Sequence, residues 1–148
     1  MEKDIYFLQE TITLSEQAYK KGQVPVGALL VDDKNNIISK GFNNQTDNEK
    51  LSHAEIITLK NQPHLYLPHC TLYVSLEPCI MCYGASLLYK IPKIIYLLPC
   101  SATGIISLGI NTDNYSLCMK SNENDISNTY KELLKKYFIE KRKKNNKE

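Results

Sequence analysis

Two short stretches of the sequence carry residue types that can hold a metal ion and move protons. Residues 53–55 (His-Ala-Glu) place an imidazole and a carboxylate two positions apart, and residues 78–82 (Pro-Cys-Ile-Met-Cys) place two thiols three positions apart. One histidine and two cysteines form a nitrogen and sulfur ligand set that selects zinc over calcium or magnesium. Three protein ligands leave one position of a tetrahedral zinc open for catalysis. The sequence therefore predicts a zinc-activated water beside Glu55.

A closed structural zinc site is the alternative interpretation of the same residues. Its fourth ligand would have to come from Cys70, His64 or His69. No second C-x-x-C pair supplies an obvious fourth ligand, and a structural site has no use for the carboxylate of Glu55. We therefore favour the catalytic interpretation, because an H-x-E followed by a strand and a P-C-x-x-C is a specific combination.

The elements that position these residues follow from the hydrophobic pattern and the turn residues. We expect helices over residues 5–21, 53–61, 79–90 and 126–144, and strands over residues 24–31, 37–42, 71–76 and 94–98. Residues 99–125 carry no clear pattern. This alternation predicts an α/β fold in which helices pack over one sheet.

Each chemical motif lies at the start of an expected helix. Cys79 and Cys82 are three residues apart on a first turn, so both sulfurs point the same way. The free N–H groups and the positive dipole end of a helix favour thiolates at such a position. The spacing of two residues keeps Glu55 off the helix face of His53, so we expect it to reach a metal-bound water rather than the metal.

The length of 148 residues and the ordinary composition predict a single domain over residues 1–148. Residues 131–148 contain eight basic and three acidic side chains, which gives that segment a net charge of +5 against −3 for the rest. Such a basic segment suits a phosphate backbone or a solvated helix end, and we expect the Lys- and Asn-rich end from about residue 141 to be disordered. With no membrane-length apolar run, no secretory signal and five cysteines, we expect a cytoplasmic location.

The H-x-E and P-C-x-x-C motifs resemble the signature of the zinc-dependent cytidine/deoxycytidylate deaminase superfamily. More narrowly, the sequence is similar to the bacterial-type tRNA adenosine deaminases, which convert adenosine to inosine at the wobble position of tRNA. The stretches that carry this resemblance are residues 24–28 (Val-Pro-Val-Gly-Ala), 41–43 (Gly-Phe-Asn), 53–56, 71–82 and 103–104 (Thr-Gly).

The resemblance implies one zinc ion per chain, held by His53, Cys79 and Cys82. It implies that Glu55 shuttles protons while a zinc-bound hydroxide displaces ammonia from the base, and that Asn43 contacts the bound nucleoside. It also implies a cytidine deaminase-like fold, a single three-layered domain with a central mixed sheet and helices on both faces. A homodimer that binds a tRNA anticodon stem-loop, with no membrane association, completes this expectation.

One loop departs from the family pattern. The tRNA deaminases typically carry Arg-Asp-x-Lys before the Thr-Gly pair, whereas this chain carries Pro99, Cys100, Ser101 and Ala102. The zinc chemistry does not need the missing charges, but RNA positioning does. Two alternatives therefore stay open: a small-molecule base deaminase of the cytosine or guanine type, and a non-enzymatic zinc module, which the intact Glu55 disfavours.

Overall fold

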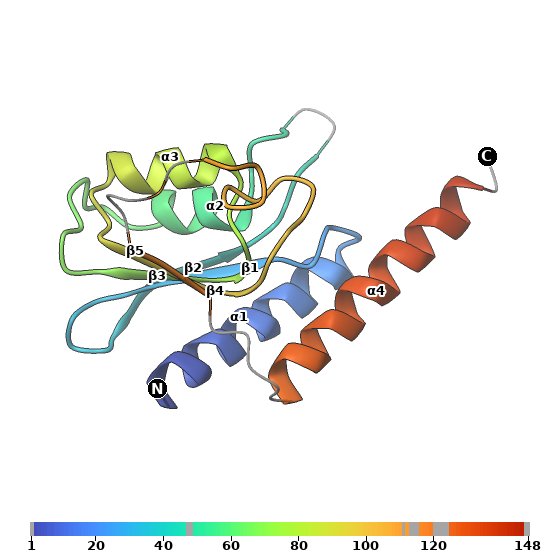
Figure 1. Ribbon diagram of the computed structural model, residues 1–148, viewed down its shortest axis with the longest axis horizontal. Coiled ribbons are helices and arrows are strands. Elements are labelled where there is room, and N and C mark those ends of the chain that lie inside the picture. The colour runs from blue at the N-terminus through green and yellow to red at the C-terminus, as the bar shows by residue number, and fades with distance from the viewer. Residues whose placement is uncertain (1, 47–48, 111, 113–115, 120–124, 147–148) are drawn as a thin grey trace.

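The computed structural model describes residues 2–46, 49–110, 112, 116–119 and 125–146. The helices are α1 (Glu2–Lys20), α2 (Ala54–Lys60), α3 (Ile80–Leu88) and α4 (Asp125–Asn145), and the strands are β1 (Gly27–Val31), β2 (Ile37–Phe42), β3 (Thr71–Leu76), β4 (Lys93–Leu98) and β5 (Ser116–Met119). The strands form one sheet in the order β2-β1-β3-β4-β5. Helices α1 and α4 cover one face, and α2 and α3 cover the other (Figure 1). This arrangement confirms the predicted three-layered α/β fold.

The sheet is mixed, and its polarity places the candidate site. Strand β1 runs antiparallel to β2 and β3, whereas β4 runs parallel to β3 and to β5. The carboxyl ends of parallel strands meet at one edge of a sheet. The segments that follow β3 and β4 therefore emerge side by side, and the thiol-bearing turn is one of them.

Strand β1 is buried along its whole length, as its continuous apolar sequence predicts. Ala28 and Leu30 face the core beneath α2 and α3, while Leu29 and Val31 face the core beneath α1 and α4. Each face of the sheet thus has its own apolar core. Because successive side chains of a strand alternate between faces, a polar substitution anywhere in β1 would enter one of the two cores.

Helix α2 packs directly against strand β2 at Gly41. A Cβ atom added at Gly41 of β2 would lie 2.8 Å from the Cγ2 atom of Ile57 on α2. Thr58 of α2 donates its hydroxyl to a backbone carbonyl at 2.7 Å within its own helix. The missing side chain at residue 41 therefore lets the helix settle on β2, and this fixes the position of His53 at its start.

Helix α4 is fastened to the sheet by a buried tyrosine. The Tyr130 side chain is fully buried, and its hydroxyl donates to the carbonyl of Pro25 at 2.7 Å. The Oγ atom of Ser75, at the end of β3, lies 3.0 Å from the same hydroxyl, and the N–H of Gly27 donates to that Oγ at 3.1 Å. One polar cluster thus joins the start of β1, the end of β3 and α4, with its hydroxyls paired as buried polar groups require.

One feature differs from the sequence-based expectation. Strand β5 lies within residues 99–125, where no element was expected, because a four-residue edge strand is too short to show a period. Helix α4 ends at Asn145, next to the expected helix end at residue 144, and disorder from about residue 141 stays a prediction. Lysine and arginine are good helix formers, so the basic end extends the last turns. None of the described helices combines the length and the apolar character of a membrane-spanning segment.

Candidate metal centre and its cavity

The three expected ligands converge at the starts of two neighbouring helices. His53 directly precedes α2 and Cys79 directly precedes α3, both with extended backbone, and Cys82 lies in the first turn of α3. The ligand atoms of these three residues all lie within 4.8 Å of one another. The structure therefore brings together the three residues that the spacing of the motifs predicted.

The distances among these atoms match a tetrahedral zinc site. The Sγ atoms of Cys79 and Cys82 lie 3.6 Å and 3.5 Å from the Nδ1 atom of His53. Zinc bonds of about 2.3 Å to sulfur and about 2.1 Å to nitrogen, at a tetrahedral angle, separate those two atoms by about 3.6 Å. The donor set and its spacing thus fit zinc, with Nδ1 as the ligating nitrogen of the histidine.

The two thiols differ strongly in acidity. Hydrogen bonds from Cys82 and from His53 lower the pKa of the Cys79 thiol to about 4, against the opposing effect of burial. The pKa of Cys82 is raised, because its thiol donates to Cys79 and is buried. The pKa of His53 is raised as well, chiefly by its hydrogen bond with Cys79. Cys79 is therefore a thiolate at neutral pH, and thiolate is the form that binds metal.

Glu55 lies beside this group without belonging to it. Its side chain is 4% exposed, and burial raises the pKa of its carboxyl to about 7. The nearby Cys79 adds to this rise, and the charge of His53 opposes it. The carboxyl group can therefore both accept and release a proton near neutral pH, as a general acid and base must.

The candidates for a fourth protein ligand lie elsewhere. His64, His69 and Cys70 line a different cavity, formed with Asp32 and residues 62–68. Within the described part of the chain, the only group of histidine, cysteine and acidic side chains with metal-binding spacing is His53 with Cys79 and Cys82. A three-ligand site with an open position is thus the arrangement that the described residues support.

The group formed by His53, Cys79 and Cys82 opens into a cavity of about 290 Å³. This volume is near the lower end of the roughly 300–1,000 Å³ of small-ligand sites, which suits a single base. Its wall combines polar side chains with an apolar part. The apolar part is formed by Val24, Val26, Leu76, Ala102 and Phe138.

Asn43 lines this cavity, and it also supports the metal centre. Its side chain is 6% exposed, and its Oδ1 atom accepts a hydrogen bond of 2.7 Å from the N–H of Ala54, the first residue of α2. Because a backbone N–H can only donate, the amide oxygen must face the helix, and the amide nitrogen faces away from it. Asn43 therefore fixes the residue next to His53.

The sequence analysis missed the contribution of α4 to the cavity. Phe138 is 46% exposed and lines the cavity, whereas the neighbouring Tyr137 is buried. Adjacent helical residues point about 100° apart, so the two rings point in different directions. This angle between neighbouring residues was the signal in the sequence that one of the two rings could point toward the cavity.

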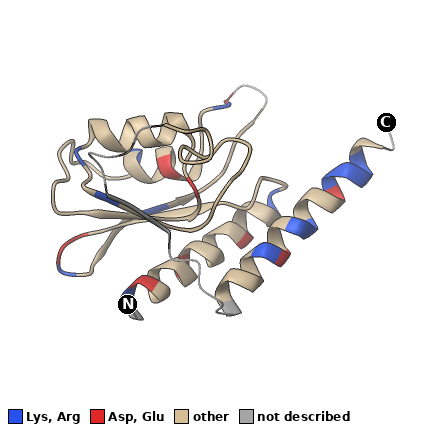
Figure 2. Cartoon of the chain, viewed as in Figure 1, with Lys and Arg blue, Asp and Glu red and all other residues tan. Residues whose placement is uncertain are grey.

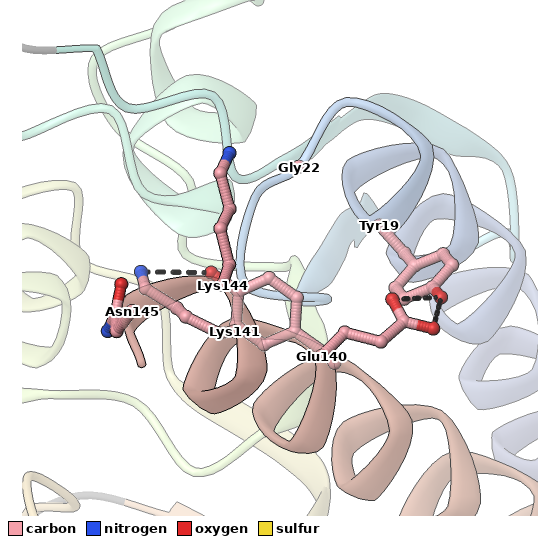
Figure 3. A pocket seen from close by; sticks show the side chains of 7 residues that line it. Tyr19, Gly22, Glu140, Lys141, Lys144 and Asn145 are labelled. Atoms are coloured by element: carbon pink, nitrogen blue, oxygen red, sulfur yellow. Dashed lines mark hydrogen bonds between the residues drawn. The ribbon is translucent and has the colours of Figure 1, made fainter. Parts of the chain in front are cut away.

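Polar and cationic contacts hold this part of α4 against α1. The hydroxyl of Tyr19 donates to the carboxylate of Glu140 at 2.6–2.7 Å (Figure 3), and the ammonium of Lys136 lies 5.4 Å from the Tyr19 ring centre. The hydrogen bond to Glu140 also raises the pKa of Tyr19. These contacts flank Phe138 on its own helix and thereby help to set where the ring meets the cavity.

Comparison with known proteins places this geometry in a family. Residues 1–98 match the family model described as the cytidine and deoxycytidylate deaminase zinc-binding region. The tRNA-specific adenosine deaminase of Haemophilus influenzae is 40% identical over 110 residues, which cover 71% of this chain and 64% of that protein. The probable cytosine deaminase of Schizosaccharomyces pombe is 39% identical over 97 residues, which cover 64% of this chain and 60% of that protein. The chain thus spans less than two thirds of the length of these relatives.

A solved structure agrees over more of the chain. It comes from a study of A-to-I editing by tRNA:A34 deaminases at the wobble position of transfer RNA, and it superposes with a TM-score of 0.72 at 26% identity. The match covers 88% of this chain and 99% of that one. Because the family model spans well over half of the chain, including all three residues with zinc spacing, the chain belongs to the cytidine and deoxycytidylate deaminase zinc-binding family.

Proposed function

We propose that this protein is a zinc-dependent hydrolase that deaminates adenosine to inosine at the wobble position of a tRNA. The observation that carries the proposal is the pairing of three ligand atoms at zinc spacing with a buried, non-ligating carboxylate in one base-sized cavity. The structural match to a wobble-editing deaminase along almost the whole chain supports the choice of substrate.

In this proposal His53, Cys79 and Cys82 would hold one zinc ion, which would supply a water activated at neutral pH. The carboxyl group of Glu55 would accept a proton, deliver it to a ring nitrogen of the base and then assist the departure of ammonia. The apolar wall of the cavity excludes water from the base and strengthens these polar interactions. The amide nitrogen of Asn43, which faces away from α2, is the donor that we assign to the nucleoside.

The basic end of α4 is the surface that we assign to the tRNA. Lysine and arginine residues gather on the last turns of the helix, which projects beyond the sheet (Figure 2). All side chains of residues 141–146 are exposed, so their charges are free to meet phosphates. A tRNA-editing role would also place the protein in the cytoplasm, where its substrate is found.

A homodimer is the assembly that we assign to this enzyme. The outer face of α3 exposes Ile80 (57%), Leu87 (40%) and Leu88 (79%). Ile106 and Leu108 are exposed on a loop that is tied to the start of this helix by a hydrogen bond from the N–H of Ile105 to Pro78. An apolar surface of this kind suits burial against a second copy of the chain.

The substrate is tested with a short anticodon stem-loop that carries adenosine at the wobble position, assayed beside free cytosine and free guanine. We expect inosine in the RNA and no turnover of either base. Substituting Glu55→Gln should keep about one zinc per chain and lower turnover by about 10²–10⁴-fold, because it removes a proton carrier. The exposed Glu16→Gln is the matched control and should change neither quantity.

Turnover of a free base alone would instead identify a small-molecule deaminase. No turnover with zinc fully loaded would indicate a chain that needs a catalytic partner. Full activity of the Glu55→Gln variant would remove this residue from the reaction.

The ligand assignment predicts a loss of metal on substitution of one thiol. Cys79→Ala should lower the zinc content, measured by mass spectrometry of the metal, well below one per chain, because two ligands hold the ion far less tightly than three. Cys100→Ala provides the control, since this thiol lines the same cavity but lies outside the ligand group. An unchanged zinc content in Cys79→Ala would exclude this residue as a ligand.

The role of the basic end predicts a change in salt dependence. Replacing Arg142, Lys143 and Lys144 by glutamine keeps good helix formers but should weaken RNA binding and lower the slope of log K against log salt by about 0.7–0.9 for each lost phosphate contact. The control is Lys34→Gln in the β1–β2 turn. An identical slope in both variants would show that the end of α4 is only solvated.

The assembly proposal predicts a change of mass. Leu88→Glu should convert a dimer into a monomer in light scattering, because it buries a charge in the interface. The control is Tyr6→Lys, which changes an exposed side chain (55%) on α1, on the other side of the sheet. A monomeric wild-type protein at micromolar concentration, or a Leu88→Glu variant that stays dimeric, would contradict the proposal.

A further inference from the structure

A second buried glutamate lies beside the metal centre, and its surroundings differ from those of Glu55. Glu77 follows β3 directly, and its side chain is 4% exposed. Its Oε1 atom accepts from the N–H of Cys100 at 3.0 Å, and its Oε2 atom accepts from the N–H of Ile106 at 2.7 Å. Ser107 adds its N–H at 3.3 Å and its hydroxyl at 3.1 Å. All four donors belong to the loop that follows β4.

The same loop is shaped around this carboxylate. A Cβ atom at Gly104 would overlap the carboxylate of Glu77, so a larger residue there would force the carboxylate or the loop to move. Gly104 also forms an isolated β-bridge with Cys79, and the N–H of Ile105 donates to the carbonyl of Pro78 at 3.2 Å. The loop therefore wraps the residues between the end of β3 and the ligand turn.

This loop supplies one wall of the cavity. Cys100, Ala102 and Thr103 line it together with Val24 and Val26, which precede β1. Residues 99–109 contain no helix or strand of their own. Their position thus depends on bonds to other parts of the chain, and the bonds to Glu77 are charge-assisted, which makes them the strong ones.

We propose that Glu77 is a positioning residue that sets the substrate-facing wall of the cavity. It takes no part in metal binding or proton transfer, because both of its oxygens are used by loop donors. A carboxylate suits this role because it only accepts hydrogen bonds, and every partner is a donor. The inference rests on the proposed function, since it assigns the wall formed by residues 100–103 to recognition of the nucleoside.

The test is Glu77→Gln, which keeps the shape of the side chain but turns an NH₂ group toward loop donors. In hydrogen exchange, the amides of Cys100 and Ile106 should exchange at least about tenfold faster than in the wild type. With the anticodon stem-loop as substrate, KM should rise by about tenfold while kcat changes by less than about threefold. Zinc content should stay at one per chain. Glu132→Gln, at an exposed site on α4, is the matched control.

A second variant approaches the same contact from the other side. Gly104→Ala should displace the loop and give the same rise in KM. Combining it with Glu77→Gln should add little, because both changes disturb the same contact between the residue 77 side chain and the loop. Unchanged exchange at Cys100 and Ile106 in Glu77→Gln would overturn the proposal. Loss of zinc would also overturn it, since Glu77 would then act on the ligand turn. A wild-type protein that is inactive on RNA would refute the proposed substrate, while the exchange measurement would still decide whether Glu77 holds the loop.

Discussion

Three ligand atoms from segments that are 26 residues apart must meet within a few ångströms, and the rest of the fold serves this requirement. Cys79 and Cys82 are held at the start of α3, three residues beyond the end of β3, whereas His53 is held at the start of α2, which packs closely against β2 at Gly41. Sulfur-to-nitrogen distances of 3.5 and 3.6 Å are those of a tetrahedral zinc site. The fold thus holds the ligands close together before a metal binds, and this preorganisation favours binding of the metal.

Glu55 and Glu77 are each 4% exposed, but their surroundings give the two carboxyl groups different properties. Around Glu55, loss of solvent outweighs the available hydrogen bonds, so the pKa rises to about 7 and the proton becomes exchangeable. Around Glu77, three backbone N–H groups and one hydroxyl surround the oxygens and fix the side chain in place. Both groups lie at the same edge of the sheet because Glu55 follows β2 and Glu77 follows β3, and these two strands, each antiparallel to β1, run in the same direction. A single sheet polarity therefore places both the proposed acid–base group and the proposed support of the cavity wall.

The sequence was sufficient where local pattern determines structure. The continuous apolar run in β1 predicted burial on both faces, and the spacings of His53 with Glu55 and of Cys79 with Cys82 predicted their arrangement. It was insufficient where a position depends on a distant segment. The overlap between a side chain at Gly104 and the Glu77 carboxylate joins residues 27 positions apart, and no local pattern encodes it. The pattern of its own helix does not reveal that Phe138 lines the cavity, because the rest of that cavity is built by other elements.

Under the proposed function, the departures at residues 99–102 bear on how this chain would attract a polyanion. The wall formed by Cys100, Ala102 and Thr103 carries no charge, so phosphate attraction must come from another element at the cavity. Helix α4 meets this need, since Phe138 lines the cavity and Arg142–Lys144 follow four to six residues later, about 6–9 Å along the helix axis. This separation is close to the Debye length of about 8 Å at physiological salt, so charges at the basic end are near enough to attract an anion at the cavity mouth. Under the proposed function, recognition of the base and attraction of the backbone are therefore divided between a neutral loop and a charged helix.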